Sequence, residues 1–232
     1  MEIKTILCLA NSRKPPSGRC IAGKEFDDGV AGAWIRPVST RPGREVSEEE
    51  RRYEAGTRVQ LLDIVAVPIV QGSPMGHQVE NVILDDRYYW EKNGEASWKQ
   101  IQTAVDAPDP RYWSHSQSTY HGHNDKVGAH SLGQIGSSLK LIAVPTVQLL
   151  VRAESGFEDS HARRRLRARF EIEDEDYLLS VTDPEMEEQY LQQGVGTYEL
   201  RDAVLCISLA EEWRDFAFRV VASIITPQRC KV

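Results

Sequence analysis

The chain has 232 residues, a formal net charge of −7 at pH 7 and 41% hydrophobic residues. This length suffices for one large domain or two small ones. No apolar run approaches the roughly 20 residues of a membrane span, so we expect no membrane contact. The negative charge argues against a protein that coats duplex DNA, because Lys and Arg side chains supply most of the non-specific affinity for phosphates.

The first half of the chain predicts five strands and one short helix. Runs of apolar and alternating residues predict strands over 3–10, 19–26, 33–39, 59–70 and 77–84. Ser47 and Glu50 have the spacing of a capping box, which predicts a helix over 47–55 that ends at Gly56.

The segment from 85 to 138 stands apart because it holds seven of the chain's eighteen aromatic residues. Ser97 is a suitable cap for a helix over 97–105. An ordered insertion needs packing of its own, so we expect most of these aromatic rings to form a small core that clamps the two halves together. A surface on which bases stack is the alternative.

The second half repeats the order of the first. Strands are predicted over 139–153, 163–172, 177–181, 203–209 and 216–226. Thr182 and Glu185 form a second capping-box pattern, Pro184 suits a first helical turn, and Gly194 ends the predicted helix over 184–193.

Each half thus has three strands, a helix and two further strands. This is the order of the OB barrel, a five-stranded Greek-key barrel. The sequence therefore predicts a mainly β protein: two OB-like five-stranded barrels in tandem, with short helices and an aromatic-rich connecting segment. The expected units are residues 1–84, 85–138 and 139–232. Barrels of this kind bind oligonucleotides or oligosaccharides on strands two and three and on the neighbouring loops.

Targeting and redox signals are weak. The first residues lead straight into a strand without a basic and apolar leader, so we expect no signal peptide. Cys8, Cys20, Cys206 and Cys230 show no paired spacing, which favours reduced thiols. We therefore expect a cytoplasmic protein.

An arginine ladder is the sharpest binding signal in the second half. The two-residue period of a strand places Leu166, Ala168 and Phe170 toward the core and alternate arginines outward. The outward residues are Arg163, Arg165, Arg167 and Arg169. Their spacing of about 6.6–7 Å is comparable to the phosphate repeat of an extended single strand. The alternative is that they pair with the acidic run at 171–176.

The equivalent face of the first half combines cations with an aromatic ring, a pattern typical of single-strand binders. The candidate residues are Asn11, Arg13, Lys14, Arg19, Trp34 and Arg36, and Trp213 in the last loop of the second half is a further stacking candidate. The alternative is a core role for Trp34. Since Trp34 and Arg36 share a strand face, we expect that they are not both buried.

Catalytic and metal motifs are missing from the sequence. His121, His123 and Asp125 alternate as metal ligands would, but Lys126 stands where a zinc hydrolase motif would carry a further histidine. There is no phosphate-binding glycine loop with lysine, no nucleophile elbow and no Cys-x-x-Cys pair. We assign no catalytic residue, metal or cofactor.

Six segments resemble the bacterial dual OB domain family: KTILCLANS at 4–12, GRCIAG at 18–23, WIRPVS at 34–39, LLDIV at 61–65, HQVEN at 77–81 and NDKV at 124–127. The resemblance runs from Lys4 to about Ile225. It implies paired OB-like barrels that bind nucleic acid, in bacterial proteins some of which are linked to defence against invading elements, and it implies no catalytic residue set. The matched segments also mark a possible polar pocket of Ser39, His77, Asn81, Asn124 and Asp125.

Three functions follow as hypotheses. The first is non-catalytic binding of single-stranded DNA or RNA through the barrel faces. The second is a nuclease or nucleotide-processing enzyme whose small polar pocket uses Asn11, Arg36, His77 and Asp125. The third is a small-ligand sensor or an adaptor for a protein partner that the sequence does not identify.

Overall fold

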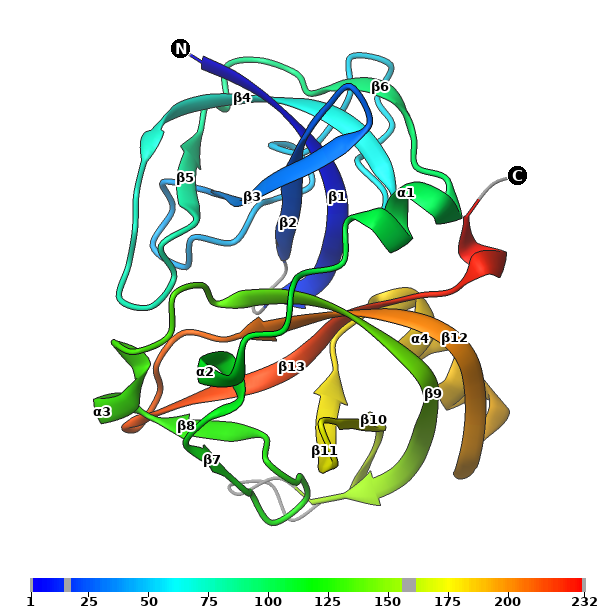
Figure 1. Ribbon diagram of the computed structural model, residues 1–232. Coiled ribbons are helices and arrows are strands. Elements are labelled where there is room, and N and C mark those ends of the chain that lie inside the picture. The colour runs from blue at the N-terminus through cyan, green and yellow to red at the C-terminus, as the bar shows by residue number, and fades with distance from the viewer. Residues whose placement is uncertain (1, 15–17, 156–161, 231–232) are drawn as a thin grey trace.

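The computed structural model describes residues 2–14, 18–155 and 162–230, and it consists of two β-barrels stacked on each other (Figure 1). The N-terminal half forms the upper barrel in that view and the C-terminal half forms the lower one. The barrels meet along a broad interface.

The first barrel has the strand order of an OB fold. In it β1 pairs with both β2 and β4, and the parallel pair of β3 with β5 completes the closure. A further strand, β6, adds to the outer side of β4. The strands are β1 (Glu2–Lys14), β2 (Gly18–Asp27), β3 (Val30–Val38), β4 (Asp63–Gly72), β5 (Asn81–Leu84) and β6 (Glu91–Glu95).

The second barrel repeats this topology. Here β9 pairs with β10 and β12, and the parallel pair of β11 with β13 closes the barrel. Two short strands extend the sheet beyond β13. The strands are β7 (Ser116–Gln117), β8 (Lys126–Gly128), β9 (Leu139–Glu154), β10 (Arg163–Ile172), β11 (Glu175–Val181), β12 (Gly196–Leu209) and β13 (Phe216–Ile225). The predicted mainly β fold with duplicated OB topology is confirmed.

The predicted helix of the second half is present as α4 (Pro184–Gln193), between the third and fourth barrel strands. Its cap is Asp183 and not Thr182, because the Asp183 carboxylate accepts from the backbone N–H groups of Glu185 and Met186. The helix ends at Gly194, whose φ of +98° suits a residue without a side chain.

The predicted helix over 47–55 is wrong, although its capping box forms. Ser47 N donates to the Glu50 carboxylate at 2.7 Å, and Glu50 N donates to Ser47 Oγ at 3.2 Å. In a helix the backbone carbonyls of this segment would accept from N–H groups four residues later. Here Arg51 O accepts from Val59 N and Arg52 O accepts from Trp90 N, both at 3.1 Å. Tertiary hydrogen bonds therefore hold this segment in turns.

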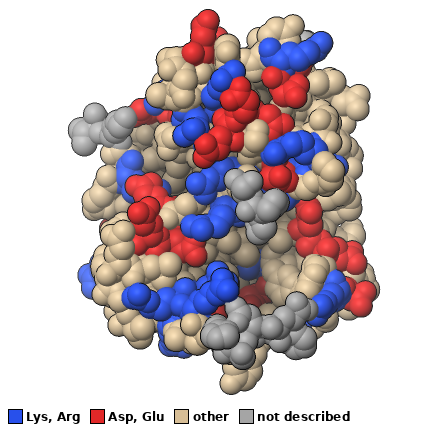
Figure 2. Space-filling view, turned by 180° about the vertical axis from the view of Figure 1, so that it is seen from behind, with Lys and Arg blue, Asp and Glu red and all other residues tan. Residues whose placement is uncertain are grey.

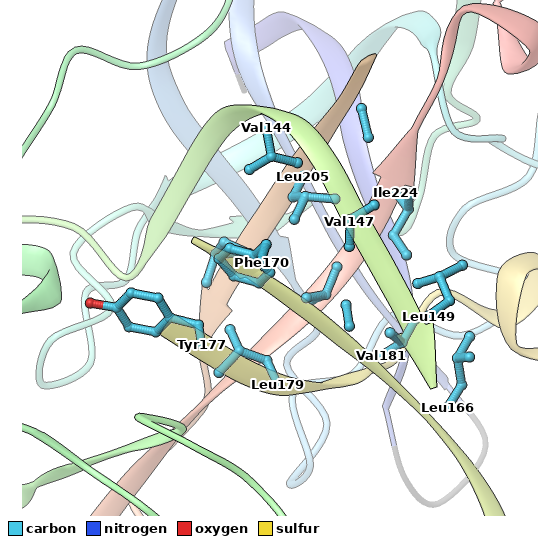
Figure 3. Close-up of a cluster of buried hydrophobic side chains, with 14 of the residues drawn as sticks. Val144, Val147, Leu149, Leu166, Phe170, Tyr177, Leu179, Val181, Leu205 and Ile224 are labelled. Carbon is cyan, nitrogen blue, oxygen red and sulfur yellow. The ribbon is translucent and has the colours of Figure 1, made fainter. Parts of the chain in front are cut away.

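Each barrel has an apolar interior. That of the second barrel is drawn in Figure 3, where side chains from β9, β10, β11, β12 and β13 converge. Leu166, Ala168 and Phe170 point into it, as the alternation in β10 predicts. The first barrel encloses residues such as Ile6, Cys8 and Trp90.

A third apolar layer joins the barrels. In β1 the side chains of Ile6 and Cys8 face the barrel interior, whereas Leu7 and Leu9 face outward into this layer. In β12 the side chains of Val204 and Cys206 belong to this layer. Those of Ala203, Leu205 and Ile207 face the interior of the second barrel. Strands buried on both faces carry near-continuous apolar runs, which explains the composition of β1 and β12.

The connecting segment does not form a core of its own, so that expectation is wrong. Trp90 is buried in the first barrel, Tyr112 in the second, and Trp98 packs against the layer between them. Tyr88 and Tyr120 are exposed. Its helices are α1 (Trp98–Thr103), capped by Ser97 as predicted, α2 (Pro110–Trp113) and α3 (Ala129–Leu132), and a 3₁₀ turn, η1 (Pro227–Arg229), lies near the other end of the chain.

A buried ion pair lies at the interface. Arg36 on β3 is 3% exposed and Glu80 before β5 is 7% exposed, and Arg36 Nη2 lies 3.1 Å from Glu80 Oε1. The same guanidinium donates to Ser138 Oγ at 2.8 Å and to Ser208 Oγ at 3.3 Å. Ser138 also donates to the Glu80 carboxylate. Two hydroxyls of the second barrel thus solvate a charge pair of the first.

Two loops complete this interface. The loop between β4 and β5 reaches the second barrel, where His77 Nε2 lies 2.9 Å from Ala210 O and Gln78 Nε2 donates to Leu209 O at 3.3 Å. Burial lowers the pKa of His77, although the backbone carbonyls beside it act in the opposite direction. The imidazole is therefore neutral where the loops meet.

We predict that Arg36→Met lowers the free energy of unfolding by about 3–5 kcal/mol, because Glu80 is left as a buried charge without its partner. The double variant Arg36→Met with Glu80→Leu should recover most of this loss. Urea unfolding at pH 7 measures both. A double variant as unstable as the single one would contradict the role of the unpaired charge. Arg201→Met, at an exposed pair with Glu199, is the control and should change the stability by less than about 1 kcal/mol.

We predict that His77→Gln flattens the pH dependence of stability below about pH 6.5, the ordinary pKa of an unfolded imidazole. In that range the unfolded chain binds a proton at His77 that the folded protein, with its lowered pKa, does not bind, so the wild type loses stability as the pH falls. Glutamine keeps a donor for Ala210 O and has no such titration. Urea unfolding at pH 7.5 and pH 5.0 gives the change in the free energy of unfolding between these two pH values for the wild type and for the variant. An equal change in both proteins would show that His77 does not contribute.

Candidate functional site

The end of β1 and the start of β2 lie where the two barrels meet. Arg13 N donates to Thr182 O at 2.9 Å, which places the last residues of β1 against the second barrel. Lys14 Nζ lies 2.7 Å from Glu211 Oε1, in the loop between β12 and β13. Arg19 on β2 lies beside them, since Arg13 and Arg19 pair across β1 and β2.

A cavity of about 280 Å³, the junction cavity, opens at this place. Its wall comes from both barrels and includes the apolar residues Pro37, Val38 and Val220 together with Ser208 and Ala210. Five basic side chains line it: Arg13, Lys14, Arg19, Arg36 and Arg44.

Two further cavities adjoin the junction cavity. The strand-side cavity, about 370 Å³, shares Arg13 and Thr182 with it and continues to Arg165 and Arg167 on β10. The helix-side cavity, about 310 Å³, shares Arg19 and is lined by Asn11 and by acidic residues of α4 and its cap. Figure 2 shows basic side chains gathered in the middle of this face and in a second group on the lower barrel. We call the junction and strand-side cavities together the junction groove.

Not every cation of the junction groove is neutralised. Four have carboxylate partners: Lys14 with Glu211, Arg36 with Glu80, Arg13 with Glu187 at 3.2 Å, and Arg167 with Glu154 at 2.6 Å. Arg19, Arg44 and Arg165 have no carboxylate partner among the residues that the structure describes. Arg44 donates to the carbonyl and the hydroxyl of Ser73, both at 3.0 Å. The groove therefore carries an excess of positive charge.

Arg19 is a partly buried cation of the groove. Burial lowers its pKa, and the neighbouring charge of Arg13 lowers it further. The pKa of Arg51 is also lowered by burial and then by Arg19. Partly desolvated guanidinium groups that repel one another would be stabilised by a bound anion.

Two buried guanidinium groups in the groove keep an N–H without a hydrogen-bond partner. Arg36 Nε and Arg167 Nη1 are both buried, and neither has an acceptor within the described part of the chain. Arg36 lines the junction cavity and Arg167 lines the strand-side cavity. Arg167 Nη1 lies 3.8 Å from Asp125 Oδ2, so a carboxylate faces it although no hydrogen bond forms.

The arginine ladder of β10 is only partly available. Arg165 is exposed, but Arg167 is buried in a bidentate pair with Glu154 of β9. Arg169 pairs with Asp176 at 2.9 Å, as the alternative for this strand predicts. Arg163 is exposed on the same face but does not line the groove.

Trp34 and Arg36 do not lie on an open face, but Arg36 is buried and Trp34 only partly so, which agrees with the expectation that they are not both buried. Trp34 is half-buried and its Nε1 donates to Asp106 at 3.1 Å, while Lys24 Nζ lies 2.6 Å from the same carboxylate. The connecting segment and the second barrel cover this face of β3. Trp213 is 54% exposed, and the Arg214 guanidinium lies 4.3 Å from the centre of its ring.

The five residues of the expected polar pocket are not brought together. Ser39 donates to Glu50 at 2.5 Å and Asn81 donates to Gln78 at 3.2 Å, both in the first barrel, where His77 also lies. Asn124 and Asp125 lie in the loop before β8, where Asp125 accepts from Thr119 N at 2.8 Å. That proposed site is therefore wrong as one pocket.

The histidines of this loop also point to separate partners. His121 Nε2 lies 3.1 Å from Ser155 O, and His123 Nδ1 lies 3.2 Å from Ser118 Oγ. Across residues 2–14, 18–155 and 162–230, no three His, Cys, Asp or Glu side chains are grouped as metal ligands.

The sequence missed several residues of the site. Arg44 comes from a loop in which its own φ is +55°, and Thr182 and Glu211 come from loops of the second barrel. Only the docking of the barrels brings these residues to the end of β1, so local sequence patterns hold no signal for them.

Comparison with protein families places the chain beside one that its sequence segments already suggested. The family model of the dual OB-containing domain matches residues 4–224. No curated protein matches the chain. Among the described residues, none of the helices has the length and apolar character needed to cross a bilayer.

Proposed function

This chain belongs to the dual OB-containing domain family, and from that premise we propose that it binds single-stranded nucleic acid in the junction groove. The observation that carries the proposal is the gathering of cations from both barrels in adjoining cavities, with three guanidinium groups lacking carboxylate partners among the described residues. Phosphate is the anion that planar guanidinium groups bind best, through two parallel hydrogen bonds.

The position of the groove follows from how the barrels dock. An OB barrel usually binds its ligand on strands two and three and the adjoining loops. In the first barrel, Lys24 on β2 and Trp34 and Arg36 on β3 already contact the connecting segment or the second barrel. The end of β1 and the start of β2 remain accessible, and they contribute residues to the groove.

Charge and size favour a single strand over a duplex. The net charge of −7 leaves a local basic surface and not a general one. Cavities of about 280 and 370 Å³ are concave sites for individual nucleotide units, which a duplex does not present. The exposed ring of Trp213 offers a stacking surface outside the groove.

We predict that Arg13→Ala with Arg165→Ala weakens binding to a single-stranded oligonucleotide and lowers its salt dependence. Each lost phosphate contact should reduce the slope of log K against log salt by about 0.7, so the double variant should lose about 1.4. Fluorescence anisotropy with single- and double-stranded DNA and RNA at several salt concentrations measures the affinity and the slope.

Arg169→Ala is the matched control. It lies on the same strand as Arg165, removes one guanidinium group as Arg165→Ala does, and does not line the groove. Its affinity and slope should stay close to those of the wild type. An unchanged slope in the double variant, or equal losses in the double variant and the control, would show that the groove is not the binding site.

A further inference from the structure

The junction cavity differs from the rest of the groove because it combines an apolar floor with a cationic rim. Pro37 and Val38 on β3 are buried, and Val220 on β13 faces them from the other barrel. Around this floor lie Arg19 and Arg44, the two rim cations without a carboxylate partner in the described chain. A sugar or base would fit the floor and a phosphate would fit the rim.

The size of the cavity limits what it holds. About 280 Å³ is at the lower end of the range of small-molecule sites, which starts near 300 Å³. This volume accommodates one nucleotide and not a run of them.

Two sides of the junction cavity are unsuited to a phosphate backbone. On one side the hydrogen bonds of His77 with Ala210 and of Gln78 with Leu209 join the two loops. On the other side, beyond Arg19, the helix-side cavity is lined by Asp183, Glu185 and Glu188, and its other cation, Arg229, already pairs with Asp183 and Glu185, both at 2.6 Å. The strand-side cavity, reached past Arg13, adds the cations of Arg165 and Arg167. A strand that lies along β10 therefore ends in the junction cavity.

The charge of the rim matches an end better than an internal phosphate. A phosphodiester carries one negative charge, whereas a phosphate monoester carries about −1.5 to −2 at pH 7. Two guanidinium groups without carboxylate partners balance the charge of the monoester.

We propose that the junction cavity binds the phosphorylated terminal nucleotide of a single strand, with Arg19 and Arg44 on the terminal phosphate. This inference rests on the proposed function. It makes the protein a reader of strand ends and gives the groove a direction, from Arg165 toward Arg19.

The protein carries its own probe of this site. All four cysteines are free, and Cys8, Cys206 and Cys230 are buried at 0%, 0% and 7% exposure. Cys20 is half-buried and lines the junction cavity. A nucleotide in the cavity should therefore protect Cys20 from alkylation.

The test uses the full chain with a twelve-residue oligothymidylate in three forms: with a 5′-phosphate, with a 3′-phosphate and with hydroxyl ends. Anisotropy gives the affinities, and mass spectrometry gives the rate at which iodoacetamide alkylates Cys20. AMP and inorganic phosphate are tested in the same alkylation assay. We expect one phosphorylated form to bind about tenfold tighter than the hydroxyl form, the effect of one charge-assisted hydrogen bond, and to slow alkylation of Cys20.

Arg19→Gln and Arg44→Gln should each remove this preference while leaving the hydroxyl form bound. Arg165→Ala should weaken all three forms alike and keep the preference. Thermal unfolding confirms that each variant is folded, and if one rim variant does not fold, the other decides.

The outcomes separate the two proposals. Equal affinity for all three forms, with Cys20 unprotected, overturns the end-binding inference and leaves single-strand binding intact. Protection of Cys20 by AMP but by no oligonucleotide identifies a free nucleotide as the ligand and also overturns it. Failure of every form to bind, together with failure of the single-stranded RNA in the anisotropy panel, overturns the proposed function, whatever AMP does.

Discussion

The arrangement of this protein depends on the burial of β1 on both of its faces. One face closes the first barrel and the other contacts β12 and β13 of the second through the layer that contains Leu7, Leu9 and Val204. Because an apolar face of this kind is unfavourable in water, docking of the second barrel stabilises the first by covering it. The ends of β1 and β2, the closure of the loops and the groove between them all follow from that docking.

The interface also contains polar groups that fix how the barrels meet. An apolar layer alone is tolerant of sliding, since burial has no preferred direction. The Arg36–Glu80 pair and its two serines require one alignment, because any other leaves charges buried without partners. The apolar layer holds the two barrels together, and the ion pair fixes their relative alignment.

Much of the fold was predictable because it is encoded locally. Alternating side chains mark β10, two apolar faces mark β1, and Pro184 and Gly194 mark the ends of α4. The segment after Ser47 shows the limit of such signals. Its capping box forms, yet the backbone bonds to Val59 and Trp90 instead of forming a helix, and these partners are distant in the sequence.

The site was predictable in composition and not in arrangement. Arg13, Lys14, Arg19 and Arg165 were identified as candidate binding cations, and the structure brings them into one groove. The sequence did not show that Trp34 and Arg36 would be covered, because that depends on where the second barrel docks. The partner of Arg167, Glu154, comes from the neighbouring strand β9 and was also missed, because the nearer acids at 171–176 appeared sufficient.

The shared wall of the junction groove has a thermodynamic consequence. Arg13 and Thr182 belong to different barrels and line the same cavities, so the groove exists only while the barrels are together. A ligand that binds there binds the docked state alone, and its binding free energy adds to the free energy that holds the barrels together. Occupancy and assembly are therefore linked functions: whatever loosens one barrel against the other releases the ligand, and the ligand in turn acts as a reversible cross-link.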